Sequence, residues 1–385
     1  MTFSVDPWDP SYGFAYDEDL AGSSPESTAE LVLDLELPAD QWRPLTPDAS
    51  LALPDTVLFL DGVRRIDARV WVHSAGQDHG AGQDHSAGQD HSAGQDHGAG
   101  QDHSAGQDHR AGQDHSAGAQ PAPGIAASYA AGLVRLNGTA RIFDVDVRRG
   151  LFTSAADAAG IDCRHASYPA WTAAGPGIDK LSLALQQRLS DAEVQLALLF
   201  RSEYPDVGDL LFVDGPLRGR THLERTIGYI KTHHTSYLPP AQAAVVGALR
   251  PGQRTPAFMM GTSWRRNSWY LRLAGTPDVP WSGVVRLECS ADLTVPEVVR
   301  LADSSALLLP PLASSPHKDP RAPQNLVPIG GLERELRRRL GDQQLLYRSL
   351  RAAAASATTA AGGGATGGSG STLSGASTRS SGGSR

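Results

Sequence analysis

Two short apolar segments of this chain end in the same dipeptide, and that dipeptide carries a carboxylate. The segments are Val57-Leu58-Phe59-Leu60-Asp61-Gly62 and Leu210-Leu211-Phe212-Val213-Asp214-Gly215. Each run predicts a buried strand with an aspartate at its tip. Two such strands side by side would bring hard oxygen ligands together for Mg²⁺ or Mn²⁺. The alternative is a pair of ordinary turns, because Asp-Gly is also a common turn signal.

A third carboxylate lies on a helix predicted between these two strands. Residues 179–201 have helical spacing, and one i, i+4 row contains Leu181, Leu185, Leu189, Glu193 and Ala197. A glutamate on such an apolar row is costly unless it is paired or bound to a cation. Glu193 is therefore a candidate metal ligand. The alternative is a slightly rotated helix on which Glu193 is solvated.

The residues after the second aspartate offer cationic groups. Thr226 to Ile230 predicts a short strand, and a basic turn with Lys231, His233 and His234 follows it. Lys231 is suited to contact a phosphate, and the two histidines could assist it, act as acid or base, or simply be solvated. Two further strands are predicted at 270–273 and 284–289. A basic helix is predicted at 330–340, whose arginines form either a solvated face or a surface for phosphates.

The charge of the chain is unevenly distributed. Of a net charge of −8, residues 1–50 carry −10 and residues 74–118 carry −6, so the remainder carries +8. The part of the chain expected to fold is therefore mildly basic, which permits binding to DNA without proving it.

The composition divides the chain into a domain expected to fold and three stretches that we do not expect to form a hydrophobic core. We expect an acidic, mostly irregular segment at 1–50, a folded domain at 51–345, and a flexible Ala/Gly/Ser tail at 352–385. Within the domain, the sequence Ala-Gly-Gln-Asp-His occurs seven times at a period of six residues. Because this stretch, placed at 74–124, has no large apolar residue, it predicts a disordered insertion in a hairpin loop. Any metal binding by its Asp and His residues would be weak.

The sequence also bears on the compartment. It contains no apolar run long enough to span a membrane and no signal peptide at its N-terminus. Its only cysteines, Cys163 and Cys289, are far apart and have no CxxC spacing. This usage indicates a reducing cytoplasm and thiols rather than a disulfide.

The order of the candidate acids resembles that of an RNase H-like nuclease core. A carboxylate on a first strand is followed by an antiparallel meander, a helical glutamate and an aspartate on a later strand. Together with the order of three further segments, 227–231, 286–288 and 322–328, these residues make the chain similar to the NurA nuclease family over roughly 55–342. The resemblance implies an α/β fold with an RNase H-like mixed sheet flanked by helices.

The resemblance also implies an activity and partners. Asp61, Glu193 and Asp214 would bind Mn²⁺ or Mg²⁺ and support single-strand endonuclease and 5′ to 3′ exonuclease activity on DNA, with Lys231, His233 and Arg286 holding the strand. The family works with HerA-type hexameric ATPases in DNA end processing and double-strand break repair, and a homodimer is expected.

One departure from the family lies near the C-terminus. A tyrosine and a histidine eight residues later are usual there, and the corresponding positions are Ala322 and Gly330. Either His317 or Glu333 substitutes for them, or the chemistry is reduced. The alternatives to a DNA nuclease are thus a catalytically reduced partner of the ATPase and an RNA-directed hydrolase on the same fold.

Overall fold

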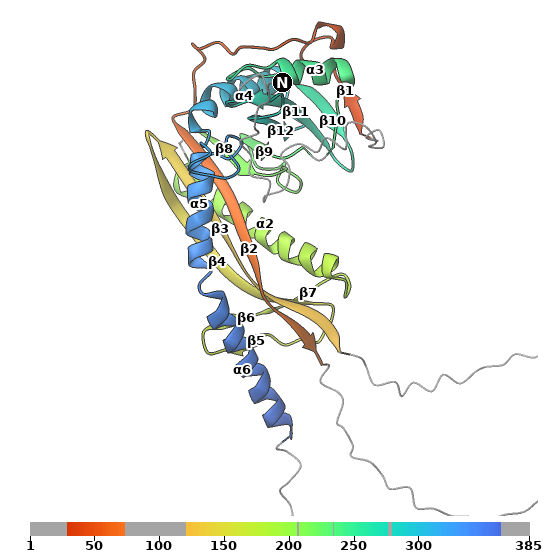
Figure 1. Cartoon of the computed structure of the whole chain (residues 1–385), viewed down its shortest axis with the longest axis vertical. Helices are drawn as coiled ribbons and strands as arrows, with labels where there is room; N and C mark the ends of the chain where they lie inside the picture. Colours follow the sequence, from red (N-terminus) through yellow and green to blue (C-terminus); the bar gives the residue numbers. More distant parts are fainter. Residues whose placement is uncertain (1–28, 74–120, 206–207, 234, 276–278, 363–385) are drawn as a thin grey trace, which may run out of the picture.

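The protein is built on one large mixed sheet (Figure 1). The computed structural model describes residues 29–73, 121–205, 208–233, 235–275 and 279–362. Within these ranges the sheet has 10 strands in the order β1 (Glu30–Val32), β10 (Phe258–Gly261), β11 (Arg265–Arg272), β12 (Val284–Ser290), β9 (Thr226–Ile230), β8 (Asp209–Asp214), β2 (Thr56–Val72), β3 (Ala122–Asn137), β4 (Thr139–Thr153) and β7 (Ala170–Thr172). Strands β5 (Ile161–Cys163) and β6 (Ala166–Tyr168) form a separate pair.

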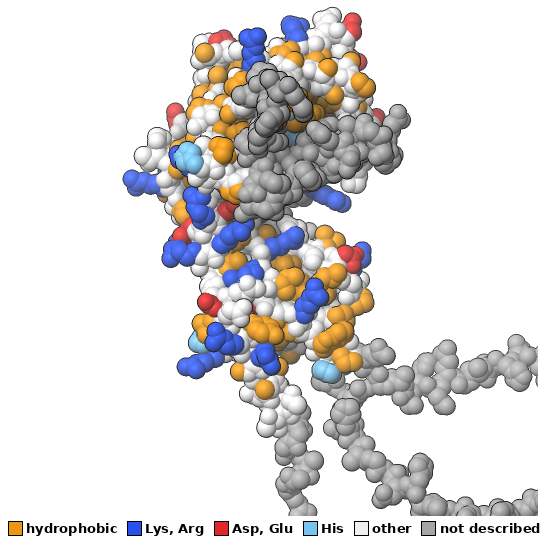
Figure 2. Space-filling view, viewed as in Figure 1, with side chains coloured by type: hydrophobic (Ala, Val, Ile, Leu, Met, Phe, Trp, Pro, Cys, Tyr) orange, Lys and Arg blue, Asp and Glu red, His pale blue; other side chains and the backbone are white. Residues whose placement is uncertain are grey.

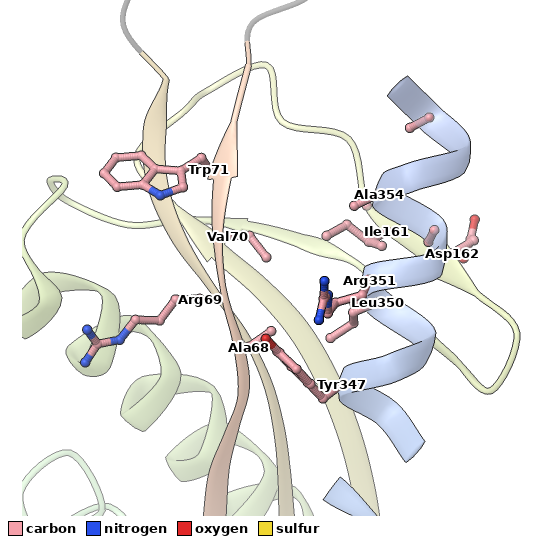
Figure 3. Close-up of a pocket in the computed structure, with 13 residues that line it drawn as sticks. Ala68, Arg69, Val70, Trp71, Ile161, Asp162, Tyr347, Leu350, Arg351 and Ala354 are labelled. Carbon is pink, nitrogen blue, oxygen red and sulfur yellow. The ribbon is translucent and has the colours of Figure 1, made fainter. Parts of the chain in front are cut away.

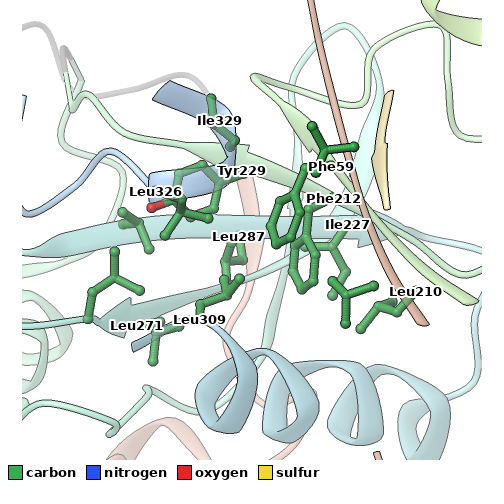
Figure 4. Close-up of a cluster of buried hydrophobic side chains, with 14 of the residues drawn as sticks. Phe59, Leu210, Phe212, Ile227, Tyr229, Leu271, Leu287, Leu309, Leu326 and Ile329 are labelled. Atoms are coloured by element: carbon green, nitrogen blue, oxygen red, sulfur yellow. The ribbon is translucent and has the colours of Figure 1, made fainter. Parts of the chain in front are cut away.

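Helices cover both faces of the sheet. They are α2 (Ile178–Glu203), α3 (Pro240–Ala248), α4 (Val295–Leu308), α5 (Val327–Arg339) and α6 (Gln343–Gly362), with short 3₁₀ turns at Ala39–Gln41 and Pro310–Leu312. Helices α4 and α5 share one core cluster with the sheet (Figure 4), whereas α2 packs on the opposite face in a second cluster. The expected α/β class with a mixed sheet flanked by helices is confirmed.

Alternation along β2 and β8 determines which side chains meet which helix. Phe59 and Phe212 belong to the core cluster under α4 and α5, while Leu60 and Val213 belong to the cluster under α2. Successive side chains of a strand point to opposite faces. Asp61 follows Phe59 by two residues, and Asp214 follows Phe212 by two, so both aspartates belong to the α5 face.

The register of β2 against β8 places the two aspartates next to each other. The strands are parallel, with Phe59 opposite Phe212 and Leu60 opposite Val213. The two phenylalanine rings stack with their centroids 5.6 Å apart. Neighbouring strands lie about 4.8 Å apart, so the next residues on this face, Asp61 and Asp214, are close neighbours.

The repeat is an insertion in a hairpin, as predicted. Strands β2 and β3 are antiparallel, and their ladder runs to the pair Val72 and Ala122, the two residues that bracket the inserted stretch. The Asn137-Gly138 turn joins β3 to β4, and Gly138 adopts a φ of 68°. Strand β3 begins at Ala122, so the insertion ends slightly before the expected residue 124. The predicted disorder of the repeat concerns residues outside the described ranges.

Three boundaries differ from the sequence-based expectations. Asp61 is not at a strand tip, because β2 continues through it to Val72, whereas Asp214 does end β8. Helix α6 extends to Gly362, well into the expected flexible tail, because alanine, abundant at 352–355, is the strongest helix former. The acidic N-terminal segment contains strand β1 within its described part, and its Glu36 accepts hydrogen bonds from buried Arg254 at 2.8 and 2.9 Å. Residues 1–28 and 363–385 lie outside the described ranges.

Two further predictions concern membranes and thiols. Among the helices of the described ranges, none has the length and apolar character needed to cross a membrane. Both cysteines are free, and Cys289 is buried within β12. Burial raises the pKa of the Cys289 thiol to about 12, so it stays protonated at neutral pH.

Candidate metal centre

Three carboxylates from distant parts of the chain meet on the α5 face of the sheet. Asp61 comes from β2, Asp214 from the end of β8 and Glu333 from α5. Each offers one oxygen atom, and these atoms all lie within 4.8 Å of one another. The predicted convergence of the two aspartates is therefore present, and a hard divalent cation prefers this all-oxygen donor set.

Helix α5 delivers the third carboxylate because of its own apolar row. Ile329, Leu332 and Leu336 are buried against the sheet, and Glu333 lies on the same side of the helix. A row that contains Ile329 and then a glutamate four residues later is the same signal that singled out Glu193. From the sequence we expected Glu333 only as a substitute for the missing tyrosine and histidine.

Asp61 is the least compensated member of the group. Its carboxylate is buried, and its Oδ1 accepts a hydrogen bond from the backbone N–H of Gly62 at 2.7 Å. Its Oδ2 has no hydrogen-bond partner among the described residues. Burial, and then the negative charge of Asp214, raise the pKa of Asp61 well above its usual value, and Lys231 opposes this shift. A buried carboxylate oxygen without a partner, on a residue grouped with two further carboxylates, fits a cation.

Two basic residues face the other two carboxylates. Lys231 Nζ lies 2.7 Å from Asp214 Oδ2 and donates a second hydrogen bond to Asn325 Oδ1 at 3.1 Å. Arg321 pairs with both oxygens of Glu333, with Nη1 to Oε1 at 2.9 Å. The predicted phosphate contact Lys231 thus lies inside the site. Lys and Arg side chains are also spread over the middle of the surface seen in Figure 2, in keeping with the basic character expected of the folded part.

Glu193 is buried as predicted but lies on the opposite face. It is 3% exposed, which excludes the solvated alternative, and its carboxylate pairs with buried Arg220. Burial raises the pKa of Glu193 to about 7, although Arg220 opposes the shift. Because α2 packs on the face away from α5, Glu193 is not a member of the group of three. The absence of a side chain at Gly62 makes room for it, since a Cβ there would lie 2.6 Å from Glu193 Oε1.

The structure does not support the other two predicted DNA contacts. His233 is 6% exposed, its Nε2 lies 3.0 Å from the Val284 carbonyl oxygen, and its ring packs near Tyr270. Arg286 is 7% exposed and pairs with buried Glu288 at 3.0 Å. Both side chains are used inside the protein. The expectation that they hold a DNA strand is therefore corrected by their burial.

The two positions that depart from the NurA pattern are both buried. Ala322 is fully buried, and a Cβ at Gly330 would lie 2.9 Å from Asp319 Oδ2. A histidine at Gly330 would have to displace Asp319. His317, one of the two suggested substitutes, is exposed and outside the group of three. Glu333, the other suggested substitute, is one helical turn after Gly330 and lies with Asp61 and Asp214.

Two hollows open on either side of Asp214. The larger, about 950 Å³, also reaches Asp61 and Glu193, and the smaller, about 430 Å³, is lined by Lys231 and Arg321. A third hollow of about 530 Å³ lies between β2, β5 and α6 (Figure 3), with Trp71 and Tyr347 on its walls. Its lining is largely apolar and contains one carboxylate, Asp162, so it offers no comparable ligand set.

Comparison with known proteins does not identify a family for this chain. No protein-family model matches the sequence, and no curated protein matches it.

Proposed function

We propose that this chain is a divalent-metal-dependent DNA nuclease. The observation that carries the proposal is the group of Asp61, Asp214 and Glu333, each of which offers an oxygen within 4.8 Å of the others. In addition, Oδ2 of buried Asp61 has no hydrogen-bond partner among the described residues. A site built from carboxylates alone favours Mg²⁺ or Mn²⁺ over softer metals. The resemblance to the NurA family supports DNA as the substrate and an RNase H-like arrangement of the sheet.

The chain's own residues divide the work at this site. Asp61, Asp214 and Glu333 would hold the cation, which would polarise the phosphodiester and lower the pKa of a bound water. Lys231 and Arg321 lie beside the carboxylates with their positive groups held by hydrogen bonds, so they are placed to neutralise the charge of an incoming phosphate. The burial of Asp61 lowers the local dielectric and strengthens each of these interactions.

The same resemblance supports a biological setting. We infer a cytoplasmic homodimer that processes DNA ends for double-strand break repair and acts with a HerA-type hexameric ATPase. The mildly basic folded part suits a DNA-bound complex.

The test is cleavage of labelled single-stranded DNA by the purified full chain with Mn²⁺, Mg²⁺ or EDTA. We expect degradation that requires the metal and is lost in Asp61→Asn and in Asp214→Asn. Asp179→Asn, at an exposed position at the start of α2, is the matched control and should retain activity. Cleavage that survives both site substitutions would refute the proposed site.

A second candidate is a catalytically reduced partner of the ATPase. It is favoured by Lys231 and Arg321, because each already pairs with a carboxylate that a metal would need. Such a protein would show neither metal-dependent melting nor cleavage, whereas a nuclease would show both. A matched RNA strand in the same assay distinguishes the RNA-directed alternative.

A further inference from the structure

A groove leads away from the carboxylates along helix α2. It is the hollow of about 950 Å³, which we call the α2 groove, and its walls come from β2, from α2 and from the loop after β8. Its lining includes Asp61 and Asp214 together with Gln187 and Ser190 of α2. The carboxylate site therefore opens into an extended surface feature rather than a closed pocket.

Two arginines on the walls of the α2 groove are available to a ligand. Arg64 on β2 and Arg218 on the loop after β8 are both exposed and line the groove. Neither side chain has an ion pair or hydrogen bond with any residue in the described part of the chain. Arg220, in contrast, is buried and paired with Glu193. Two uncompensated cations beside a carboxylate site suit a polyanion whose phosphates extend beyond the metal.

A second hollow continues the α2 groove. This hollow, of about 500 Å³, shares Gln187, Ser190 and Gly219 with the groove. Its walls also carry Arg148 and His222, and Arg188 paired with Asp191. The two hollows together form a path over the solvent side of α2. A ligand that fills both must be longer than a single nucleotide, which points to a chain of phosphates.

The α2 groove also contains an exposed apolar side chain. Leu183 is 63% exposed and lines the groove. The bases of an unpaired strand present apolar faces, whereas a duplex presents mainly phosphates and sugars to such a surface. Arginines and an exposed leucine in one groove therefore match an unpaired strand better than a duplex.

We propose that a single DNA strand lies in the α2 groove, with its phosphates against Arg64 and Arg218 and a base against Leu183, and that it continues past Arg148. This path rests on the proposed nuclease function. It makes Arg64 and Arg218 positioning residues for the strand, in place of the buried His233 and Arg286.

Strand binding can be measured separately from cleavage. The probe is a fluorescein-labelled 20-mer of oligo(dT), titrated with the full chain in EDTA so that no metal-dependent cleavage occurs, and read by anisotropy. For single strands, the logarithm of the binding constant falls by about 0.7 per phosphate contact for each tenfold rise in salt concentration. At 0.1 M salt one contact therefore contributes about fivefold in affinity. Arg64→Ala and Arg218→Ala should each weaken binding by about fivefold, and the double variant by about 25-fold with a shallower salt dependence. Arg250→Ala, an exposed arginine in the loop after α3, is the matched control.

The outcomes separate the path from the activity. If the Arg64→Ala/Arg218→Ala double variant binds the strand with wild-type affinity, the proposed strand path is wrong. This holds even if Asp61→Asn abolishes cleavage and thereby supports the proposed nuclease function. Loss of binding in the double variant with an unchanged melting temperature supports the path, even if no cleavage is found. The assignment to a single DNA strand is also overturned if the double variant loses as much affinity for a duplex of the same length. It is likewise overturned if the two arginines matter for binding of oligo(U) but not of oligo(dT).

Discussion

Replacing Asp61 with asparagine should make the metal-free protein more stable and remove its response to Mn²⁺. In the site, Lys231 faces Asp214 and Arg321 faces Glu333. Among the described residues, Asp61 has one hydrogen-bond partner, the Gly62 N–H, and its Oδ2 has none. Asp61→Asn keeps the shape, removes the uncompensated charge and supplies an amide that can donate to a neighbouring carboxylate.

The size of this effect follows from burial. A buried polar group without a partner costs about 1–3 kcal/mol, and a charged one costs more. For a domain of this size each kcal/mol shifts the melting temperature by about 2–4 °C, so Asp61→Asn should melt about 2–12 °C higher than the wild type in EDTA. With Mn²⁺ at 100 times its Kd the wild type should gain about 2.7 kcal/mol, and the variant should gain much less.

The pH dependence of the metal-free protein provides a second readout. The folded-state pKa of Asp61 is raised above its unfolded value, so its contribution to stability is fully present below the unfolded value, near 4. It is lost as the pH rises through the folded pKa, because the buried group must then ionise. The wild type should therefore lose stability over this range, and Asp61→Asn should lose less.

The assay is differential scanning calorimetry of wild type, Asp61→Asn and the control Asp179→Asn in EDTA and in Mn²⁺, from pH 5 to pH 8. A lower melting temperature for metal-free Asp61→Asn, together with an undiminished response to Mn²⁺, would refute the reasoning. Asp61 would then be a structural residue rather than a ligand.

Four further substitutions test the surroundings of the site. Lys231→Met should destabilise the metal-free protein by about 1–3 kcal/mol and increase the melting shift caused by Mn²⁺, because a competing cation is removed; a smaller shift would mean that Lys231 orients the ligands. Glu333→Gln should reduce Mn²⁺ binding in calorimetric titration, whereas Glu193→Gln should preserve it. Glu193→Gln should instead cost about 3–5 kcal/mol of stability, because Arg220 loses its buried partner. If Glu193→Gln reduced Mn²⁺ binding and Glu333→Gln did not, Glu193 would be the third ligand. Gly62→Ala should lower the free energy of unfolding in urea by about 1–3 kcal/mol, since the new Cβ would lie 2.6 Å from Glu193 Oε1. An unchanged urea midpoint would contradict this close approach.

The meeting of the two aspartates could be predicted because identical local patterns place them. Both follow a phenylalanine by two residues, so period-2 alternation puts both on the face of their aromatic neighbour. The burial of Glu193 could likewise be predicted from its helical row. The sequence could not predict which face of the sheet α2 covers, because this depends on how the chain crosses the sheet rather than on the helix sequence. For this reason Glu333, on a second helix with the same kind of row, occupies the place expected for Glu193.

The incorrect DNA contacts have a different origin. Every residue of β12 from Val284 to Cys289 is buried, because helices cover both faces of this part of the sheet. Alternation then gives no solvent side, and Arg286 cannot be recognised as internal from its position in the strand. His233 follows β9 in a turn that packs near Tyr270, a contact between segments far apart in the sequence.

The parallel pairing of β2 with β8 makes the carboxylate site a reporter of folding. Asp61 and Asp214 lie 153 residues apart in the sequence, and their strands must pair across that distance, which is a slow step in folding. A slip of one residue in this pairing would turn Asp214 to the α2 face and divide the ligands between two sides of the sheet. Mn²⁺ should consequently bind only chains in which the β2–β8 register is already correct, and time-resolved metal uptake during refolding would measure the completion of that single ladder.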